Sequence, residues 1–181
     1  MNLSQEYITT VIRRLKYYKD LADKTFEQIS DADFHYQPDA ASNSIAVIIQ
    51  HMAGNMLSRW TNFLTEDGEK EWRQRDDEFA VHDYSRAQLI DLWEKGWDCF
   101  IGALESVKEE DLLKTIYIRK EGLTVMDAIN RQLAHQPYHV GQIAYLGRMC
   151  RGSQWKSLSI PKGQSLQYNS SNEVKDPAKK Y

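Results

Sequence analysis

Four stretches of the chain repeat apolar and polar residues with the period of an amphipathic helix. Apolar side chains recur three, four or seven positions apart, which places them on one face of each helix. The pattern predicts helices over about residues 4–29, 44–64, 85–107 and 125–150. The predicted core faces include Val11, Leu15, Ala22 and Ile29, then Ile45, Ile49, Met52, Met56 and Phe63, then Leu89, Gly96, Phe100 and Leu104, and last Val125, Ala128, Ile129, Ile143 and Leu146.

Three polar residues stand where helices are expected to begin. Ser4 is positioned to cap the first helix, and Thr124 the fourth. Ser85, followed three residues later by Gln88, has the form of a capping box. These caps place the starts of three of the four helices.

The segments between the helices lack this period. Residues 30–43, interrupted by Pro38, are expected to form a loop. Residues 65–84 are rich in charge and should form a long loop between the second and third helices, of a length that is usually functional or mobile. The short alternating piece TIYIRK is extended at most, and no helical pattern follows Arg151.

Four helices of this length in a chain of 181 residues predict an all-α fold, a four-helix bundle. We expect one helical domain over residues 1–168 and a flexible tail over 169–181. Trp60, Trp93 and Trp97 give the helices more aromatic surface than one small core is expected to bury. The exposed part would favour a homodimer.

Composition excludes several classes of protein. The net charge of −3 offers no basic field for nucleic acid or an anionic membrane. The first residues do not resemble a signal peptide, and no apolar run is long enough to span a bilayer, so a cytoplasmic protein is expected. Cys99 and Cys150 form no close-spaced motif, which disfavours a disulfide framework or a cysteine zinc site.

Candidate chemistry is concentrated in the histidines. His135 and His139 are four residues apart and fall on the apolar face of the fourth helix, while His51 borders the apolar face of the second. Two imidazoles at this spacing can bind one ion from a single helix, and a third from a facing helix completes the set. Three neutral ligands leave a position open, as in catalytic sites, and suit zinc, nickel or ferrous iron.

The alternative reading is that these are hydrogen-bonded core histidines, and His35 and His82 are expected to be loop residues. Pro137 lies between the paired histidines, so the fourth helix should kink there or be irregular before it.

Other polar residues could support such a site. Asn55 and Gln142 lie one turn from the histidines and could orient ligands or substrate. No carboxylate lies beside the histidine pair on its helix, so a loop residue, Asp76, Asp77 or His82, would have to act as a base. The charged run over residues 73–78 is either a solvated loop or a lid that presents charges to the metal or substrate.

Three segments together resemble the DinB/YfiT-like superfamily, and more narrowly an uncharacterised bacterial branch of it. They are NSIAVIIQHMAGNMLSRW, DGEKEWRQRDDEF and LAHQPYHVGQIAYLGR, and the similarity extends from about residue 5 to 168. The resemblance implies a bundle with up-down-down-up connectivity and a metal held by His51, His135 and His139. It also implies that dimers are common and that characterised relatives use low-molecular-weight thiols such as bacillithiol or mycothiol.

These observations favour a metal-dependent enzyme acting on a small molecule, a thiol-dependent S-transferase of the bacillithiol type. The open metal position and the missing helical base rank thiol transfer above hydrolysis. A metal-dependent hydrolase and a non-catalytic metal- or ligand-binding stress protein remain the alternatives.

Overall fold

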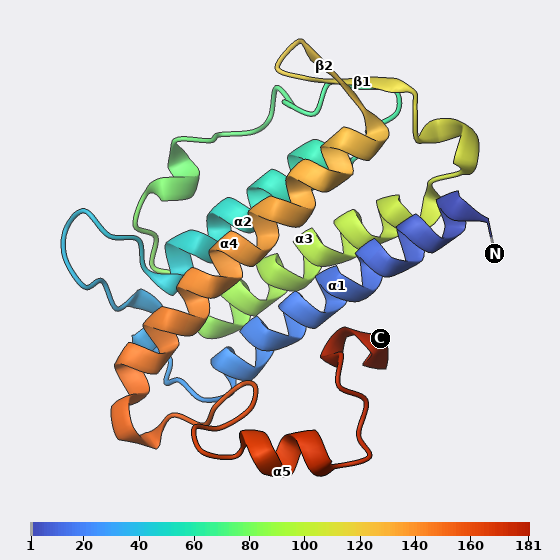
Figure 1. Cartoon of the computed structure of the whole chain (residues 1–181). Coiled ribbons are helices and arrows are strands. Elements are labelled where there is room, and N and C mark those ends of the chain that lie inside the picture. The colour runs from blue at the N-terminus through green and yellow to red at the C-terminus, as the bar shows by residue number, and fades with distance from the viewer. Residues whose placement is uncertain (1) are drawn as a thin grey trace.

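Four long helices dominate the computed structural model, which describes residues 2–181. They are α1 (Leu3–Phe26), α2 (Ile45–Trp60), α3 (Arg86–Ser106) and α4 (Val125–Arg151). The helices lie side by side, with α2 against α3 and α4, and α1 against α4 and α3 (Figure 1). The fold is thus predominantly helical, and all four predicted helices are confirmed within a few residues of their expected bounds.

Short elements occupy the connections. A two-stranded antiparallel hairpin, β1 (Thr115–Ile118) and β2 (Glu121–Thr124), stands between α3 and α4. The predicted extended piece is therefore a strand paired with the residues that follow it. The remaining helices are η1 (Ala32–His35), η2 (Asp77–Phe79), η3 (Glu109–Asp111), η4 (Gly152–Gln154), α5 (Ser165–Ser170) and η5 (Pro177–Lys180).

Helix caps agree with the sequence at two of three positions. Ser85 and Gln88 form the predicted capping box, and the Thr124 side chain accepts the backbone N–H three residues on. The cap predicted at Ser4 is wrong, because the side chain of Asn2 accepts from the backbone instead and the helix begins two residues earlier. Both side chains can fill an N-cap, so the choice depends on where the chain enters the helix.

The core lies between the four long helices and is formed by their predicted apolar faces. Trp60, Trp93 and Trp97 are only 3%, 0% and 1% exposed. Trp93 packs edge-on against Phe26, and its Nε1–H donates to Asp23 Oδ1 at 2.8 Å. The expectation that these tryptophans leave surplus aromatic surface is therefore wrong, and the homodimer stays a prediction without that support.

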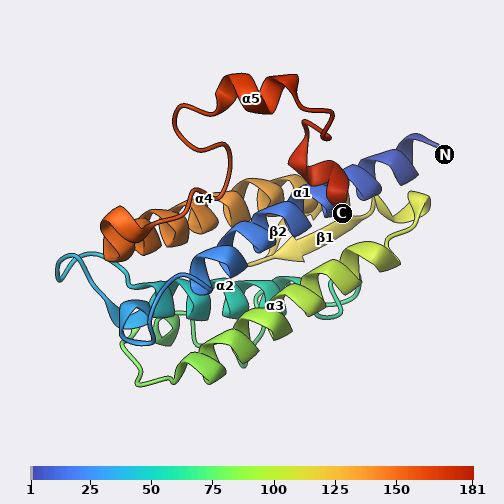
Figure 2. The same ribbon diagram turned by 90° about the horizontal axis from the view of Figure 1, so that it is seen from below.

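The long loop between α2 and α3 is tied to its neighbours by backbone groups. Asp67 accepts the backbone N–H groups of Arg119 and Lys120 at 2.9 and 2.8 Å, across the hairpin turn where both residues have positive φ. Ser58 on α2 donates to the Gly68 carbonyl at 2.6 Å. The loop therefore lies against both the hairpin and α2 (Figure 2).

Helix α4 continues through Pro137 without interruption. The alternative that the helix is irregular before Pro137 is wrong, because the residues on both sides keep helical conformation. His135 and His139 therefore keep the one-turn spacing expected of them.

The chain after α4 is more structured than its sequence suggests. The expected absence of helix after Arg151 is wrong, since α5 and η5 form there. Asp176 pairs with Arg14 of α1, and Ala178 is 2% exposed. The division into a domain at 1–168 and a flexible tail at 169–181 stays a prediction. None of the helices within residues 2–181 is long and apolar enough to cross a membrane.

Candidate metal centre

Three imidazoles from two helices converge at one point. Helix α2 supplies His51, and α4 supplies His135 and His139 from successive turns. The Nε2 atom of His135 lies 3.4 Å from that of His51 and 3.2 Å from that of His139. One ligand atom from each ring lies within 4.8 Å of the others, so the three predicted histidines form one cluster that could hold a metal ion.

Two of the three nitrogen separations match those of a tetrahedral site. Nitrogen ligands at the usual zinc distance lie about 3.3 Å apart along the edge of a tetrahedron. The distances from His135 Nε2 to the Nε2 atoms of His51 and His139 both fall close to this value. A single proton could be shared along only one of these contacts at a time, whereas one ion would bind all three nitrogens. The donor set therefore fits a divalent transition metal.

Two of the three rings are oriented by partners on the opposite nitrogen. His139 Nδ1–H donates to Gln142 Oε1 at 2.8 Å, and His51 Nδ1–H donates to Glu78 Oε2 at 3.0 Å. A proton held on Nδ1 leaves the lone pair on Nε2, which is the atom facing the cluster centre. The contact of Gln142 is of the kind that an orienting residue makes, and its role stays a prediction, whereas the contact of Glu78 was not expected.

His135 differs from its neighbours. Its Nδ1 is buried and has no hydrogen-bond partner within residues 2–181. Burial, together with the neighbouring charges of His139 and His51, lowers the pKa of His135 to about 3. Burial also lowers the pKa of His139. Both rings are therefore neutral at pH 7, which is the protonation state that a metal ligand needs.

Glu78 is the candidate site residue that sequence reasoning missed. It lies in the charged run of the long loop, but it is buried and accepts from Arg73 Nε and Nη2 at 2.6 and 2.9 Å. Burial alone would raise the pKa of Glu78, but the hydrogen bonds from His51 and Arg73 lower it, so the carboxylate is ionised. The loop thus places a charged pair directly behind a metal-ligand candidate.

The absence of a side chain at Gly54 leaves room for the Glu78 carboxylate. Gly54 lies on α2 one turn after His51, and a Cβ at this position would lie 2.3 Å from Glu78 Oε1. A glycine on the polar side of a helix beside a histidine was the one sequence signal of a close approach there. It could not have identified which loop residue approaches.

The other candidate residues form hydrogen bonds or ion pairs with groups other than the three histidines, or are exposed. The Asn55 Oδ1 atom accepts from Gln132 Nε2 at 3.0 Å rather than from a histidine. The Asp76 side chain is fully exposed, and Asp77 is paired with His82 at 3.2 Å. Asp76, Asp77 and His82 therefore make no hydrogen bond to His51, His135 or His139. His35 was expected in a loop but ends the short helix η1 between α1 and α2; it is exposed, and its Nε2 contacts the Tyr84 carbonyl at 2.9 Å.

Replacement of Gly54 by alanine should weaken metal binding although no ligand is changed. The added methyl would displace Glu78 from His51, and loss of such an outer contact typically costs about 10- to 100-fold in affinity. Zinc titration of the metal-free protein against a competing chelator measures the change. Gly102→Ala in α3 is the matched control, because no atom lies within 4 Å of its Cβ position. Equal zinc affinities in the two variants would refute the role given to Glu78.

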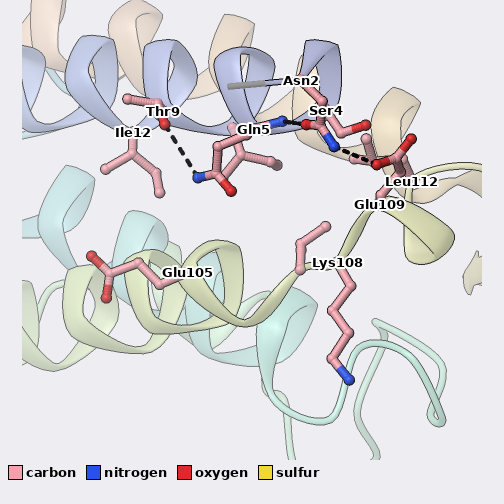
Figure 3. A pocket seen from close by; sticks show the side chains of 11 residues that line it. Asn2, Ser4, Gln5, Thr9, Ile12, Glu105, Lys108, Glu109 and Leu112 are labelled. Carbon is pink, nitrogen blue, oxygen red and sulfur yellow. Dashed lines mark hydrogen bonds between the residues drawn. The ribbon is translucent and has the colours of Figure 1, made fainter.

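A cavity in another part of the molecule has no metal-binding histidines. It occupies roughly 360 Å³ between the start of α1 and the end of α3. Asn2 donates to Glu109 there, and Gln5 to Thr9, with Lys108 nearby (Figure 3). No histidine or cysteine lines it, so the histidine cluster is the stronger candidate.

Comparison with known proteins gives a family and a fold. The family described as "Protein of unknown function (DUF1572)" matches residues 2–164. A solved structure, "Crystal structure of the conserved protein of locus from Enterococcus faecalis", is similar with a TM-score of 0.62 and 18% identity, covering 84% of this chain and 99% of that one. At this identity the likeness shows the fold alone. No curated protein matches the chain.

Proposed function

Since the chain belongs to the family described as "Protein of unknown function (DUF1572)", which carries no activity with its name, we propose a function from the site itself: a metal-dependent enzyme that transfers a low-molecular-weight thiol to a small electrophile. The observation that carries the proposal is the convergence of the Nε2 atoms of His51, His135 and His139. Three imidazole nitrogens form a ligand set that leaves a coordination position for a substrate.

Some residues of the site would bind the metal ion, and others would orient the rings that bind it. The three histidines would hold zinc, nickel or ferrous iron, while Gln142 and Glu78 fix two of the rings. When bound, the ion would supply a Lewis acid that keeps a thiol in its thiolate form at neutral pH. In the transfer, a sulfur–carbon bond forms, the electrophile loses its leaving group, and the thiol proton passes to solvent.

The surroundings of Glu78 support thiol transfer over hydrolysis. Hydrolysis of a difficult bond usually needs a general base, and Glu78 is the carboxylate in contact with the cluster. Its oxygens are occupied by Arg73 and by His51 Nδ1, on the side of the ring away from the cluster centre. A thiol that loses its proton on binding needs no such base.

We extend the proposal to the finer fold and assembly. The four long helices are assigned the up-down-down-up connectivity of the DinB/YfiT-like superfamily, which is supported by the directions of the ribbons, with α1 and α4 opposed to α2 and α3 (Figure 1). A homodimer remains part of the proposal, with light scattering of the untagged protein as its test.

Zinc- or nickel-loaded protein should conjugate bacillithiol, or another low-molecular-weight thiol, to a reactive electrophile such as a haloarene faster than the uncatalysed reaction. The loss of thiol and the formation of conjugate are both measured, and His51→Ala should return the rate to background. Cleavage of simple esters or amides without any thiol would replace the transferase with a hydrolase. If metal binds but neither reaction occurs, a non-catalytic binding protein is the better description.

A further inference from the structure

A second feature adjoins the histidine cluster: a small cavity with an arginine lining. It occupies roughly 180 Å³, and His51 and His135 form part of its wall. Asn55 and Gln132 contribute amides, and no carboxylate lines it. Its arginines are Arg59, Arg73, Arg75, Arg119 and Arg131, drawn from α2, the long loop, the hairpin and α4.

Carboxylates around the cavity do not neutralise these arginines fully. Glu69 contacts Arg59 at 2.8 Å and Arg119 at 3.1 Å, and Glu78 is shared between Arg73 and a histidine. Glu69 is therefore shared among arginines, since it also lies 3.6 Å from Arg73, and one oxygen of Glu78 is partly occupied by a histidine. The cavity retains an excess of positive charge.

Two further arginines have little or no neutralisation. Arg75 lies 3.9 Å from the fully exposed Asp76, a contact too long for a hydrogen bond. Arg131 is exposed on α4 one turn before His135, and within residues 2–181 it makes no ion pair. These are the two guanidinium groups best placed to gain a partner.

Buried donors in the cavity wall also lack acceptors. The Arg73 side chain is 2% exposed, yet its Nη1 has no hydrogen-bond partner and lies 3.6 Å from the nearest Glu69 oxygen. Trp60 Nε1 is likewise buried without a partner in the described chain. Buried N–H groups normally find an acceptor, and an unpaired one is costly. A ligand rich in acceptor oxygens would give these donors hydrogen-bond partners.

We infer that the arginine cavity binds the anionic group, a carboxylate or phosphate, of the small molecule on which the metal centre acts. Guanidinium groups bind these oxyanions in paired hydrogen bonds, and the volume suits a charged group of a few atoms rather than a whole large ligand. The link to a substrate rests on the proposed function, whereas the anion site stands on the arginines alone. The anion would fix the molecule with its reacting part toward His51 and His135.

Anion binding to the metal-free protein tests this inference separately from the metal. The probes are inorganic phosphate and malonate, titrated calorimetrically at low salt after chelator treatment, with neutral malonamide as the uncharged comparison. Wild-type protein should bind one or both anions and not malonamide. Arg131→Gln and Arg75→Gln should each weaken binding by about tenfold, the typical worth of one charge-assisted hydrogen bond.

Arg148→Gln is the matched control, because Arg148 is exposed on the same helix as Arg131 but does not line the cavity. It should bind the anions as wild type does. Absence of anion binding by wild-type protein, or equal weakening in Arg131→Gln and Arg148→Gln, would overturn the inference. Zinc affinity, measured in the same variants, should not change with Arg131→Gln. Anion binding by a protein that binds no metal would refute the proposed function and leave the anion site in place.

Discussion

Alanine in place of His139 is expected to abolish stoichiometric metal binding and to leave the helices folded. The substitution removes one of three ligands. It should lower the metal affinity by more than the roughly 100-fold that loss of a residue contacting a ligand can cause. The core is formed by apolar side chains such as Leu15, Ile49 and Phe100, all fully buried, so the helical scaffold does not depend on the imidazole. Elemental analysis of untagged protein should give one ion per chain for wild type, and circular dichroism should be unchanged in the variant.

His35→Ala is the matched control for this experiment. His35 is exposed in η1 and contacts a backbone carbonyl, so its removal should leave the metal content of the protein intact. Complete unfolding of His139→Ala would mean that the protein folds only around its ion. A wild-type protein that binds no divalent metal under any condition would remove the metal centre altogether.

The largest effect on stability is expected from Glu78→Ala. The substitution leaves the Arg73 guanidinium buried without its principal partner, and breaking a buried ion pair typically costs about 3–5 kcal/mol. Urea unfolding of the metal-free protein measures the free energy of unfolding directly. Replacing both residues, as in Arg73→Met with Glu78→Leu, should recover part of the loss because no uncompensated charge remains.

Asp76→Ala provides the comparison for Glu78→Ala. Asp76 lies in the same acidic run, but its side chain is fully exposed, so its loss should change the free energy of unfolding by less than about 0.5 kcal/mol. Similar unfolding midpoints for the two alanine variants would contradict the buried pair that the structure shows.

The sequence predicts what repeats with a helical period. The four long helices and the shared face of His135 and His139 follow from spacing, because residues four apart share a helix face. The prediction that His51 joins them came from its place beside the apolar face of its own helix and from the family resemblance. The Ser85 cap also follows from local pattern. The helices, the histidine pair and the cap each depend on residues close together in the chain.

What the sequence does not predict depends on contacts between distant segments. Residues 73–78 look like a solvated run, yet Arg73 and Glu78 are buried because Asp67 binds the hairpin turn and Gly54 leaves room beside α2. The prediction that the tryptophans leave exposed aromatic surface was wrong for a similar reason. Periodicity shows which side of a helix Trp93 occupies, but the packing of neighbouring helices decides how much aromatic volume the core accommodates.

The unequal division of the three histidines between α2 and α4 has a mechanical consequence. His135 and His139 move together on one helix, so any sliding of α2 along α4 changes the position of His51 alone. An ion held by all three would act as a cross-link between the two helices, and its binding free energy would oppose their separation. Loss of the ion would therefore loosen one interface of the molecule, the α2–α4 contact, and not the fold as a whole.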